Sequence, residues 1–372
     1  MTEPIRILQV FAEMNRGGAE TMIMNLYRHI DRGKIQFDFI VHTQEKCAFD
    51  EEIEQLGGRI YRVPKYVGKN HFAYKNAWKD FFISHPGYRI IHGHVRSTAS
   101  IYLNIAKRNG LITIAHSHSI ESRGNWLERK VKNIMQLPIR YIADFYFACS
   151  DQAGEWLFGK NVIYKDNYYI LKNAIEIKKY EFDELKRIKI KEKLGIKDEL
   201  VIGHVGNFTF PKNHQFLIEI FFEFQKKNKN TKLLLVGSGV LENSIRKKIS
   251  DLYLDNNVIL TGSVSNVYDY MQVMDIFVFP SIFEGLGMAA IEAQASGLYT
   301  FVSDKIPEDV HLTNLIEVIP LKKSAQYWAY IISKHSGSYQ RVDTSIELRN
   351  HGYDIEATAN WIYNFYLKIT EN

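Results

Sequence analysis

The chain has few cysteines and no long apolar run. Its 372 residues include only Cys47 and Cys149, which form no Cys-x-x-Cys pair, so a disulfide scaffold and a cysteine-based metal or redox site are excluded. The apolar runs fall far short of the about 18–20 residues that a helix needs to cross a bilayer. The first residues lack the pattern of a secretory signal. These absences predict a cytoplasmic protein.

Two glycine-rich nucleotide-binding motifs are also missing. The sequence contains no Gly-x-Gly-x-x-Gly string, and Val236–Gly239 lacks the third glycine of that motif. It contains no Gly-x-x-x-x-Gly-Lys-Ser/Thr string either. A nicotinamide-dependent enzyme and a P-loop nucleotidase are therefore not expected.

The composition is that of a soluble globular protein with about two domains, since 46% of the residues are apolar and 24% are charged. Strand and helix patterns alternate along both halves, which predicts an α/β fold of two Rossmann-like, doubly wound parallel-sheet domains. The charged stretch Lys178–Asp198 marks the expected boundary. We therefore expect an N-terminal domain at residues 1–177 and a C-terminal domain at residues 178–372.

Buried strands are expected in both domains. Those of the first domain are Ile5–Phe11, Phe37–His42, Arg89–Gly93, Ile112–His116, Phe145–Ala148 and Tyr168–Leu171. Those of the second domain are Leu200–Val205, Lys232–Val236, Val258–Leu260, Ile276–Phe279, Tyr299–Val302 and Ile316–Ile319. Apolar residues at spacings of three and four predict a final amphipathic helix over 355–369. This helix can cross to the first domain or pack on its own, and the pattern leaves both open.

Positive charge is concentrated in the first half of the chain. Residues 1–175 contain 24 Lys and Arg against 17 Asp and Glu, whereas the remainder contains 23 against 25. This excess indicates either a solvated face or an anionic partner, such as a lipid surface, a phosphate-bearing substrate or nucleic acid. The chain has no recognised nucleic-acid motif, so nucleic acid is not the expected partner.

Two glutamates flank the predicted start of a helix. Glu284 follows a buried strand and Pro280, so it lies in a loop at the carboxyl end of the sheet, where open α/β folds bind ligands. Free backbone N–H groups at the helix start suit a diphosphate. The carboxylate of Glu292, inside the helix, can accept two hydrogen bonds from a ribose diol. The alternative is a helix start with well-placed acids and no ligand.

The frame FPSIFEGLGMAAIEAQASG, in which seven residues separate Glu284 from Glu292, resembles the signature of retaining glycosyltransferase family 4, which has the GT-B fold. Other segments resemble family motifs and occur in the family's order over about residues 5–310. They are Gly17–Glu20, Ile91–His94, Ile114–His118, Leu171–Ile175, Val205–Asn213, Leu235–Gly239 and Leu260–Val264.

The resemblance implies an enzyme that moves a sugar from a nucleotide-sugar donor, with UDP as the expected nucleotide, to a saccharide acceptor. The second domain would bind the donor and the first the acceptor, across a cleft. Glu292 would hold the ribose, and Val264 would lie against the base. Lys212 would pair with the diphosphate, and Glu284 would touch the donor sugar. The other donor-binding residues implied are Gly17, Gly18, Asn207, Gly237, Gly285, Leu286, Gly287 and Met288.

The resemblance also implies a histidine near the reacting centre, so that the expected catalytic residues are Glu284, Lys212 and His116. His118 is an alternative to His116, because the Ala-His-Ser-His-Ser frame permits either. His92 and His94 are expected to support packing beneath the site.

The chain departs from the family pattern at the diphosphate. Asn207 replaces the arginine that usually follows Val-Gly, so Lys212 would carry more of the charge, or Lys305 or Arg16 would substitute. Metal-dependent transferases usually carry an Asp-x-Asp pair. None occurs in the sequence, so neither a metal nor another cofactor is expected. The family implies retention of configuration by a front-face reaction, and no nucleophile is assigned.

Residues 125–137 mix apolar side chains, including Trp126, with the cations Arg129, Lys130 and Lys132. Such a helix suits an anionic membrane surface. We therefore expect peripheral binding to the inner face of the cell membrane and a lipid-linked oligosaccharide acceptor, in extracellular or capsular polysaccharide biosynthesis. A core helix with a solvated edge is the alternative. The competing functions are another GT-B enzyme, such as a sugar-nucleotide epimerase, and a polyanion-binding protein that uses the basic N-terminal half.

Overall fold

The computed structural model describes residues 3–119, 125–335, 337 and 340–371. The chain divides into two compact units, of which the first joins Met1–Ile175 to Gly352–Asn372 and the second is Glu176–His351. The first crossing between units thus lies two residues before the predicted boundary. The final segment falls within the predicted second domain, although the pattern left its packing open, and it belongs to the first unit.

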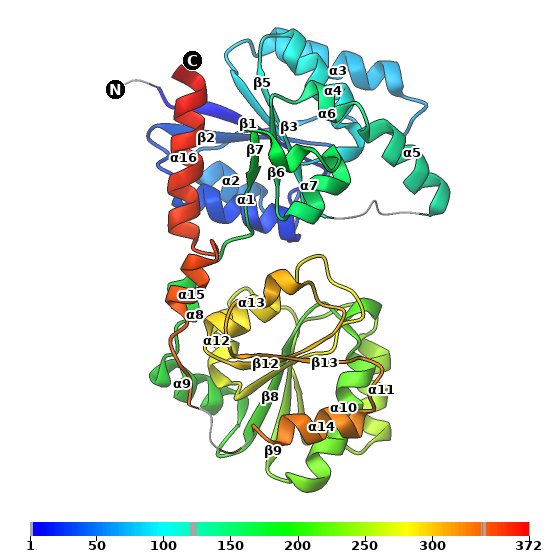
Figure 1. Ribbon diagram of the computed structural model, residues 1–372, viewed down its shortest axis with the longest axis vertical. Helices are drawn as coiled ribbons and strands as arrows, with labels where there is room; N and C mark the ends of the chain where they lie inside the picture. Colours follow the sequence, from blue (N-terminus) through cyan, green and yellow to red (C-terminus); the bar gives the residue numbers. More distant parts are fainter. Residues whose placement is uncertain (1–2, 120–124, 336, 338–339, 372) are drawn as a thin grey trace. The chain divides into compact units, whose positions relative to one another are not determined.

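The first unit is built around a parallel sheet (Figure 1). Among the described residues its seven strands run in the order β3-β2-β1-β4-β5-β6-β7. They are β1 (Ile5–Phe11), β2 (Ile35–Val41), β3 (Ile60–Arg62), β4 (Ile90–Gly93), β5 (Ile112–Ser117), β6 (Phe145–Ala148) and β7 (Tyr168–Ile170). Apart from β3, which is short and only half-buried, each overlaps a predicted strand.

Helices connect and cover these strands. They are α1 (Gly18–His29), α2 (Asp50–Gln55), α3 (His71–Ser84), α4 (Arg96–Arg108), α5 (Trp126–Gln136), α6 (Ile139–Ile142), α7 (Asp151–Phe158) and α16 (Ile355–Glu371), together with the 3₁₀ turn η1 (Val162–Tyr164). The side chains of Asn125 and Ser150 accept hydrogen bonds from the first turns of α5 and α7, which explains why those helices begin there.

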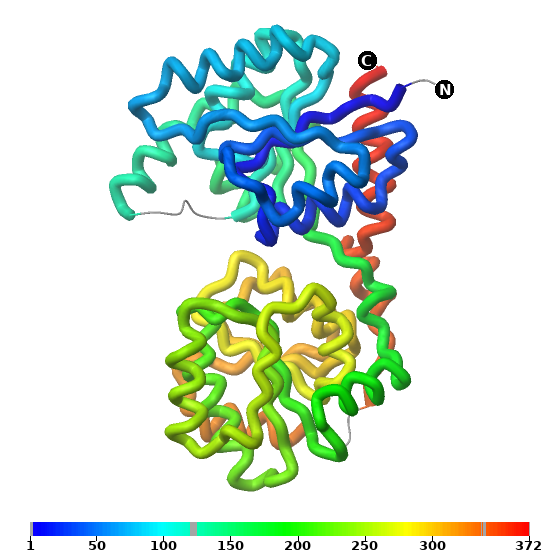
Figure 2. The backbone as a smooth tube through the Cα atoms, turned by 180° about the vertical axis from the view of Figure 1, so that it is seen from behind, coloured from blue at the N-terminus to red at the C-terminus, as the bar shows by residue number. Residues whose placement is uncertain are grey.

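The C-terminal helix α16 completes the core of the first unit. Its buried residues Ile362, Phe365 and Tyr366 join an apolar cluster with Ile7 of β1 and Phe37 of β2. Figures 1 and 2 both show this helix beside the N-terminal segments, although almost the whole chain separates them in sequence. Burial of its apolar face explains the spacing of three and four seen in the sequence.

The second unit repeats the same plan. Its described residues form six parallel strands in the order β10-β9-β8-β11-β12-β13. They are β8 (Leu200–Val205), β9 (Thr231–Val236), β10 (Val258–Leu260), β11 (Ile276–Phe279), β12 (Tyr299–Ser303) and β13 (Ile316–Ile319). All six were predicted to within one residue. The two sheets confirm the predicted fold class of two Rossmann-like parallel-sheet domains.

The helices of the second unit are α8 (Ile177–Tyr180), α9 (Glu184–Leu194), α10 (His214–Lys227), α11 (Glu242–Asp251), α12 (Val267–Val273), α13 (Met288–Ala295), α14 (Ala325–Ser333) and α15 (Ser345–Asn350), with the 3₁₀ turns η2 (Phe210–Lys212) and η3 (Glu308–Val310). The charged stretch predicted as a boundary contains α9. This helix is fixed to its own unit, because Arg187 pairs with Asp275 at 2.6 Å and donates to the backbone of Gln272 at 3.0 Å.

Each sheet has one point where the chain reverses the direction in which it adds strands. In the first unit this switch point lies between β1 and β4, and in the second between β8 and β11. Doubly wound sheets bind ligands just beyond the carboxyl ends of the strands at such a point. The two switch points are therefore the places to look for function.

Candidate active site

A lysine–glutamate ion pair lies at the switch point of the second unit. Lys212 ends the turn η2 that follows β8, and Glu284 lies in the loop between β11 and α13. The Lys212 Nζ atom is 2.8 Å from Oε1 and 3.0 Å from Oε2 of Glu284, and it also lies 4.7 Å from the centre of the Phe279 ring. Both side chains are largely buried, which strengthens their attraction relative to a surface pair.

Backbone and amide hydrogen bonds hold the two loops together. Ile282 N donates to Pro211 O at 2.7 Å, and Asn213 Nδ2 donates to Pro280 O at 3.1 Å. Gly206 leaves space for the lysine stem, since a Cβ there would lie 3.2 Å from Lys212 Cδ. The ion pair is therefore held by its surroundings as well as by charge.

The helix α13 begins beside this pair at Gly287, whose φ of 89° is the left-handed conformation that glycine adopts readily. Glu292 lies in the second turn of the helix. Burial raises the pKa of Glu292 to about 7, while the hydroxyl of Tyr180 and the charge of Lys212 act in the opposite direction. Glu292 is half-buried, and an acid with this pKa gains or loses its charge near neutral pH.

Two buried histidines lie behind the lysine. His204 Nδ1 is 2.9 Å from Val278 O, and the rings of His204 and His214 are 4.7 Å apart. Burial is the main cause that lowers their pKa, for His214 to about 4, and Lys212 adds to the effect. Both are therefore neutral at neutral pH, and Lys212 is the cation of this group.

The other predicted donor-binding residues are spread over both units. Gly237 packs tightly, because a Cβ there would lie 2.1 Å from Gly206 O. Val264 is half-buried and Asn207 is exposed. In the loop before α13, Gly285 is exposed and Leu286 and Met288 are half-buried. Gly17 and Gly18 belong to the first unit, where they begin α1.

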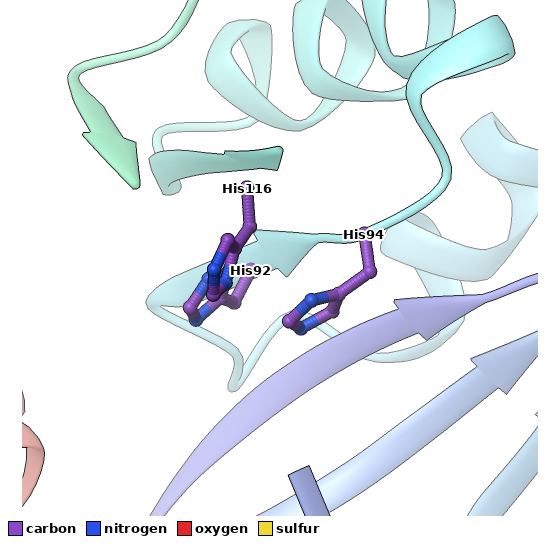
Figure 3. Close-up of side chains that lie close together, drawn as sticks. All are labelled: His92, His94 and His116. Atoms are coloured by element: carbon purple, nitrogen blue, oxygen red, sulfur yellow. The ribbon is translucent and has the colours of Figure 1, made fainter. Parts of the chain in front are cut away.

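Four histidines lie at the carboxyl ends of β4 and β5, next to the switch point between β1 and β4. His92 lies in β4, and His94 is the first residue after that strand. In the same way, His116 lies in β5, and His118 is the first residue after it. Figure 3 shows the rings of His92, His94 and His116 gathered on one side of the sheet. The rings of His116 and His118 are stacked with centres 3.9 Å apart. The structure thus brings together both histidines that the sequence left as alternatives.

Hydrogen bonds link these histidines to Gln9 of β1 and Tyr366 of α16. The six residues form what we call the histidine network: Gln9, His92, His94, His116, His118 and Tyr366. Burial lowers the pKa of all four histidines, that of His118 to about 3, so the rings are neutral at neutral pH. His92 and His94 therefore do more than pack beneath the site.

Sequence reasoning missed Gln9, Tyr366 and Tyr180. Gln9 is a fully buried polar residue within a strand whose other residues are mostly apolar, and that is the signal that could have found it. Tyr366 and Tyr180 carry no comparable signal, because an aromatic residue on an apolar helix face is ordinary core.

The histidine cluster also has the composition of a metal site. His92, His94 and His116 each place one nitrogen within 4.8 Å of the others. However, ring nitrogens of all three already meet hydrogen-bond partners at 2.7–3.2 Å, so a metal ion would have to replace bonds that the protein makes by itself.

A pocket of about 830 Å³ lies in the first unit beside α5. Segments that follow β1 and β2 line it, together with the start of α4 and Leu127, Val131 and Met135 of α5. All eleven residues of α5 are described, and only Gln136 is buried. The alternative of a core helix is thus wrong. Trp126 and Ile134 are 69% and 67% exposed, which leaves large apolar side chains on the surface.

Family models match both units. The model of glycosyl transferases group 1 matches residues 186–312, and that of glycosyltransferase family 4 matches residues 16–179. EpsF of Bacillus subtilis (strain 168), which is classed as a glycosyltransferase, is 32% identical over 98% of this chain and 97% of its own. The chain belongs to glycosyltransferase family 4. The resemblance seen in the sequence is confirmed, and the protein is a glycosyltransferase enzyme of the hexosyltransferase type.

Other comparisons agree with the assignment of this chain to a glycosyltransferase family. The capsular polysaccharide biosynthesis glycosyltransferase CapH of Staphylococcus aureus is 23% identical over 98% of this chain and 99% of its own. The crystal structure of Anabaena HepE in complex with UDP and glucose superposes with a TM-score of 0.77 at 17% identity, covering 97% of this chain and 99% of HepE. That of WaaG, a glycosyltransferase involved in lipopolysaccharide biosynthesis, gives 0.66 at 15% identity, with 97% and 95% covered. These likenesses confirm the GT-B fold.

The matched segments include the polar groups at both switch points of the glycosyltransferase. Lys212, Glu284 and Glu292 lie within residues 186–312, and His92 to His118 lie within residues 16–179. Gln9 and Tyr366 lie outside both ranges, so the matched segments hold the four histidines of the network but not the two residues that link them.

Proposed function

We propose that the enzyme transfers a hexose from a UDP-sugar to a hydroxyl group of a lipid-diphosphate-linked saccharide, with retention of configuration and without a metal ion. The observation that carries the proposal is the position of Lys212 and Glu284 at the glycine-rich start of α13, with Glu292 in the next turn. A cation, backbone amides at a helix start and a carboxylate would thus be available to a diphosphate and a ribose.

The chemistry required is stabilisation of the departing nucleotide diphosphate. Negative charge develops on it as the bond to the sugar breaks, and prearranged donors lower the energy of that state. Lys212 would supply the positive charge and the amides near Gly287 and Met288 the neutral donors. Glu292 would accept from the ribose in its ionised form. Glu284 holds Lys212 and would turn toward the donor sugar.

Names of relatives support the donor and the acceptor. A galactosyltransferase of Escherichia coli, 24% identical over 58% of this chain, is named for UDP-Gal and a diphosphoundecaprenol-linked sugar. A Campylobacter jejuni transferase, 32% identical over 36% of this chain, is named for a diphospho-undecaprenol acceptor. The names CapH and CapM of Staphylococcus aureus refer to capsular polysaccharide. We carry a UDP-sugar, a lipid-linked acceptor and polysaccharide assembly to this chain on that basis.

The first experiment measures release of free nucleotide and transfer of sugar with a panel of UDP-, GDP- and ADP-sugars. We expect turnover with a UDP-sugar and no loss of it when a chelator is present. Glu292→Ala is expected to abolish binding of the nucleotide sugar, and Glu284→Ala to lower turnover. Glu223→Ala, which breaks a surface ion pair with Lys226 on α10, is the matched control.

The competing functions give different results in the same experiment. An epimerase would convert the nucleotide sugar without releasing nucleotide. A polyanion-binding protein would release nothing, and Glu284→Ala and Glu292→Ala would leave its binding unchanged. Normal turnover in both glutamate variants would reject the assignment of the donor site.

We assign α5 a membrane role within this proposal. Its exposed Trp126 and Ile134 accompany three cations, and the Lys130 ammonium lies 5.1 Å from the centre of the Trp126 ring. Each basic residue near an anionic surface contributes about 1 kcal/mol of binding. No helix in the described part of the chain combines the length and apolar character needed to span a bilayer. Association through α5 would therefore be peripheral.

Flotation with anionic vesicles tests this role. Combined Arg129→Ala, Lys130→Ala and Lys132→Ala should abolish recovery with the vesicles. A matched variant with Lys226→Ala, Lys227→Ala and Lys229→Ala removes the same charge from the second unit and should float like the wild type. Equal recovery of all three proteins would show that α5 does not bind the membrane.

A further inference from the structure

The histidine network consists of two branches that meet at the side chain of Gln9. In the first branch, Gln9 Nε2 donates to the Tyr366 hydroxyl at 3.3 Å, and that hydroxyl is 2.7 Å from His92 Nδ1. His92 Nε2 is then 3.2 Å from His116 Nδ1. In the second branch, Gln9 Oε1 is 2.9 Å from His94 Nε2, and His94 Nδ1 is 2.7 Å from His118 Nε2.

The amide of Gln9 fixes the direction of the first branch. The Tyr366 oxygen accepts from Gln9, and among the described residues the hydroxyl proton then finds an acceptor only at His92 Nδ1, so this nitrogen accepts it. A neutral imidazole carries one proton, so that of His92 lies on Nε2 and is donated to His116 Nδ1. The proton of His116 therefore lies on Nε2.

The second branch runs the other way. The carbonyl oxygen of Gln9 can only accept, so His94 carries its proton on Nε2 and accepts at Nδ1. His118 then donates through Nε2, which leaves its Nδ1 without a proton. One branch ends in an N–H donor at His116, and the other ends in an acceptor at His118.

The two terminal nitrogens, His116 Nε2 and His118 Nδ1, have no hydrogen-bond partner among the described residues. Both atoms are buried, and buried polar atoms are rarely left unpaired unless a ligand or function requires it. The rings of His116 and His118 are stacked with their centres 3.9 Å apart, so this donor and acceptor lie on adjacent rings. A hydroxyl group, which accepts and donates at one oxygen, satisfies both, whereas a phosphate or carboxylate oxygen satisfies only the donor.

The geometry points to Gln9 and Tyr366 as positioning residues that hold His116 as a donor and His118 as an acceptor, so that the pair receives one hydroxyl group of a sugar substrate. The identity of the ligand as a sugar rests on the proposed function, whereas the assignment of the histidine tautomers does not. Both histidines left open by the sequence are used, in opposite roles. Tyr366 gives the C-terminal helix α16 a part in the chemistry of the first unit.

Nuclear magnetic resonance of the full chain, with ¹⁵N in the histidine rings, tests the positioning roles without any substrate. Two-bond proton–nitrogen couplings distinguish a proton on Nε2 from one on Nδ1. We expect all four network histidines to carry it on Nε2. A proton on Nδ1 throughout would mean that the Gln9 amide is reversed, and this would overturn the assignment. Retention of a metal ion by the purified protein, detected by elemental analysis, would also overturn it.

Tyr366→Phe removes the hydroxyl and keeps the packing of the ring. In this variant His92 and His116 should become mixtures of the two tautomers, while His94 and His118 keep theirs, because their branch reaches Gln9 directly. Tyr363→Phe, on the same helix and outside the network, is the matched control and should change nothing. Should Tyr366→Phe fail to fold, Gln9→Met removes both contacts at similar side-chain length and is expected to release both branches.

Kinetics then test the use of the pair. The value of kcat/KM for the sugar substrate should fall about tenfold in Tyr366→Phe and stay unchanged in Tyr363→Phe, as expected for one lost hydrogen bond. An unchanged value in a variant whose tautomers are mixed would overturn the role in substrate binding. If the wild type transfers no sugar from any donor, the proposed function fails. The spectra still support or overturn the roles of Gln9 and Tyr366.

Discussion

The two units share one order of strands but place opposite chemistry at the switch point. In the first unit, four neutral histidines form hydrogen-bonded branches at the ends of β4 and β5. In the second, Lys212 and Glu284 form an ion pair between the segments that follow β8 and β11. A neutral donor and acceptor suit the hydroxyl groups of a sugar, and a lysine cation suits a diphosphate. On the proposed function, the same fold would offer two kinds of recognition, set by the residues just beyond its strands.

The largest expected effect comes from removing the cation of the second unit. Lys212→Ala should lower kcat for sugar transfer by about 100- to 1,000-fold, because the developing charge on the diphosphate loses its counter-charge. The measurement is the initial rate at saturating donor. Lys248→Ala, which breaks the surface pair with Glu219 in the same unit, should retain full activity. A fall of less than about tenfold would mean that the charged site lies elsewhere.

The next largest effect is expected from acid, which should destabilise the first unit more than the second. Burial lowers the pKa of His42 to about 4 and of His118 to about 3, and it lowers the pKa of the other three network histidines as well. Below about pH 6.5 these histidines bind protons in the unfolded chain but stay neutral in the folded protein. The free energy of unfolding therefore falls as the pH drops. In the second unit, the described histidines with this shift are His204 and His214.

Hydrogen exchange by mass spectrometry, corrected for the pH dependence of the intrinsic rate, measures each unit separately. Peptides of the first unit should lose more protection between pH 7 and pH 5 than those of the second. An equal loss of protection in both units would contradict the expected difference between them.

Glu292 is expected to change the stability with pH in the opposite direction to the buried histidines. Its pKa is raised from 4.5 to about 7, so between these values the folded state keeps a proton that the unfolded state has lost. The contribution of Glu292 to stability therefore falls as the pH rises through this window and is least favourable above pH 7. Glu292→Gln removes that loss and should stabilise the protein by about 3 kcal/mol at pH 8, with little effect at pH 4. Thermal melts at the two pH values measure it, and a gain that is equal at both would contradict the assigned pKa.

The smallest effect is expected where the chain departs from its family. Asn207 is exposed near the Lys212 turn, so Asn207→Arg adds a cation without disturbing the core. Because an exposed charge is well screened, the KM for the nucleotide sugar should fall only about threefold. Asn207→Gln, of similar polarity and no charge, is the control. An unchanged KM would mean that residue 207 does not face the diphosphate.

Most of the fold could be predicted, and the second-unit site only in part. The strands of the second unit are compact apolar runs bounded by turn residues, which is a local signal. The frame around Glu284 and Glu292 also lies within one short segment. The ion pair joins residues 72 positions apart, and no local pattern predicts that Glu284 meets Lys212. The length of β3, only three residues, leaves too little periodicity to detect.

By itself the sequence determined the alternation of strands and helices, the two parallel sheets and the family signature, because each depends on residues close together in the chain. Only the tertiary structure decided that the final helix joins the first unit and that Tyr366 meets His92, 274 positions away. It also decided that one amide, that of Gln9, directs both histidine branches. The physical reason is that hydrogen bonds between distant segments depend on how apolar faces pack, and this packing has no signature in any single stretch of sequence.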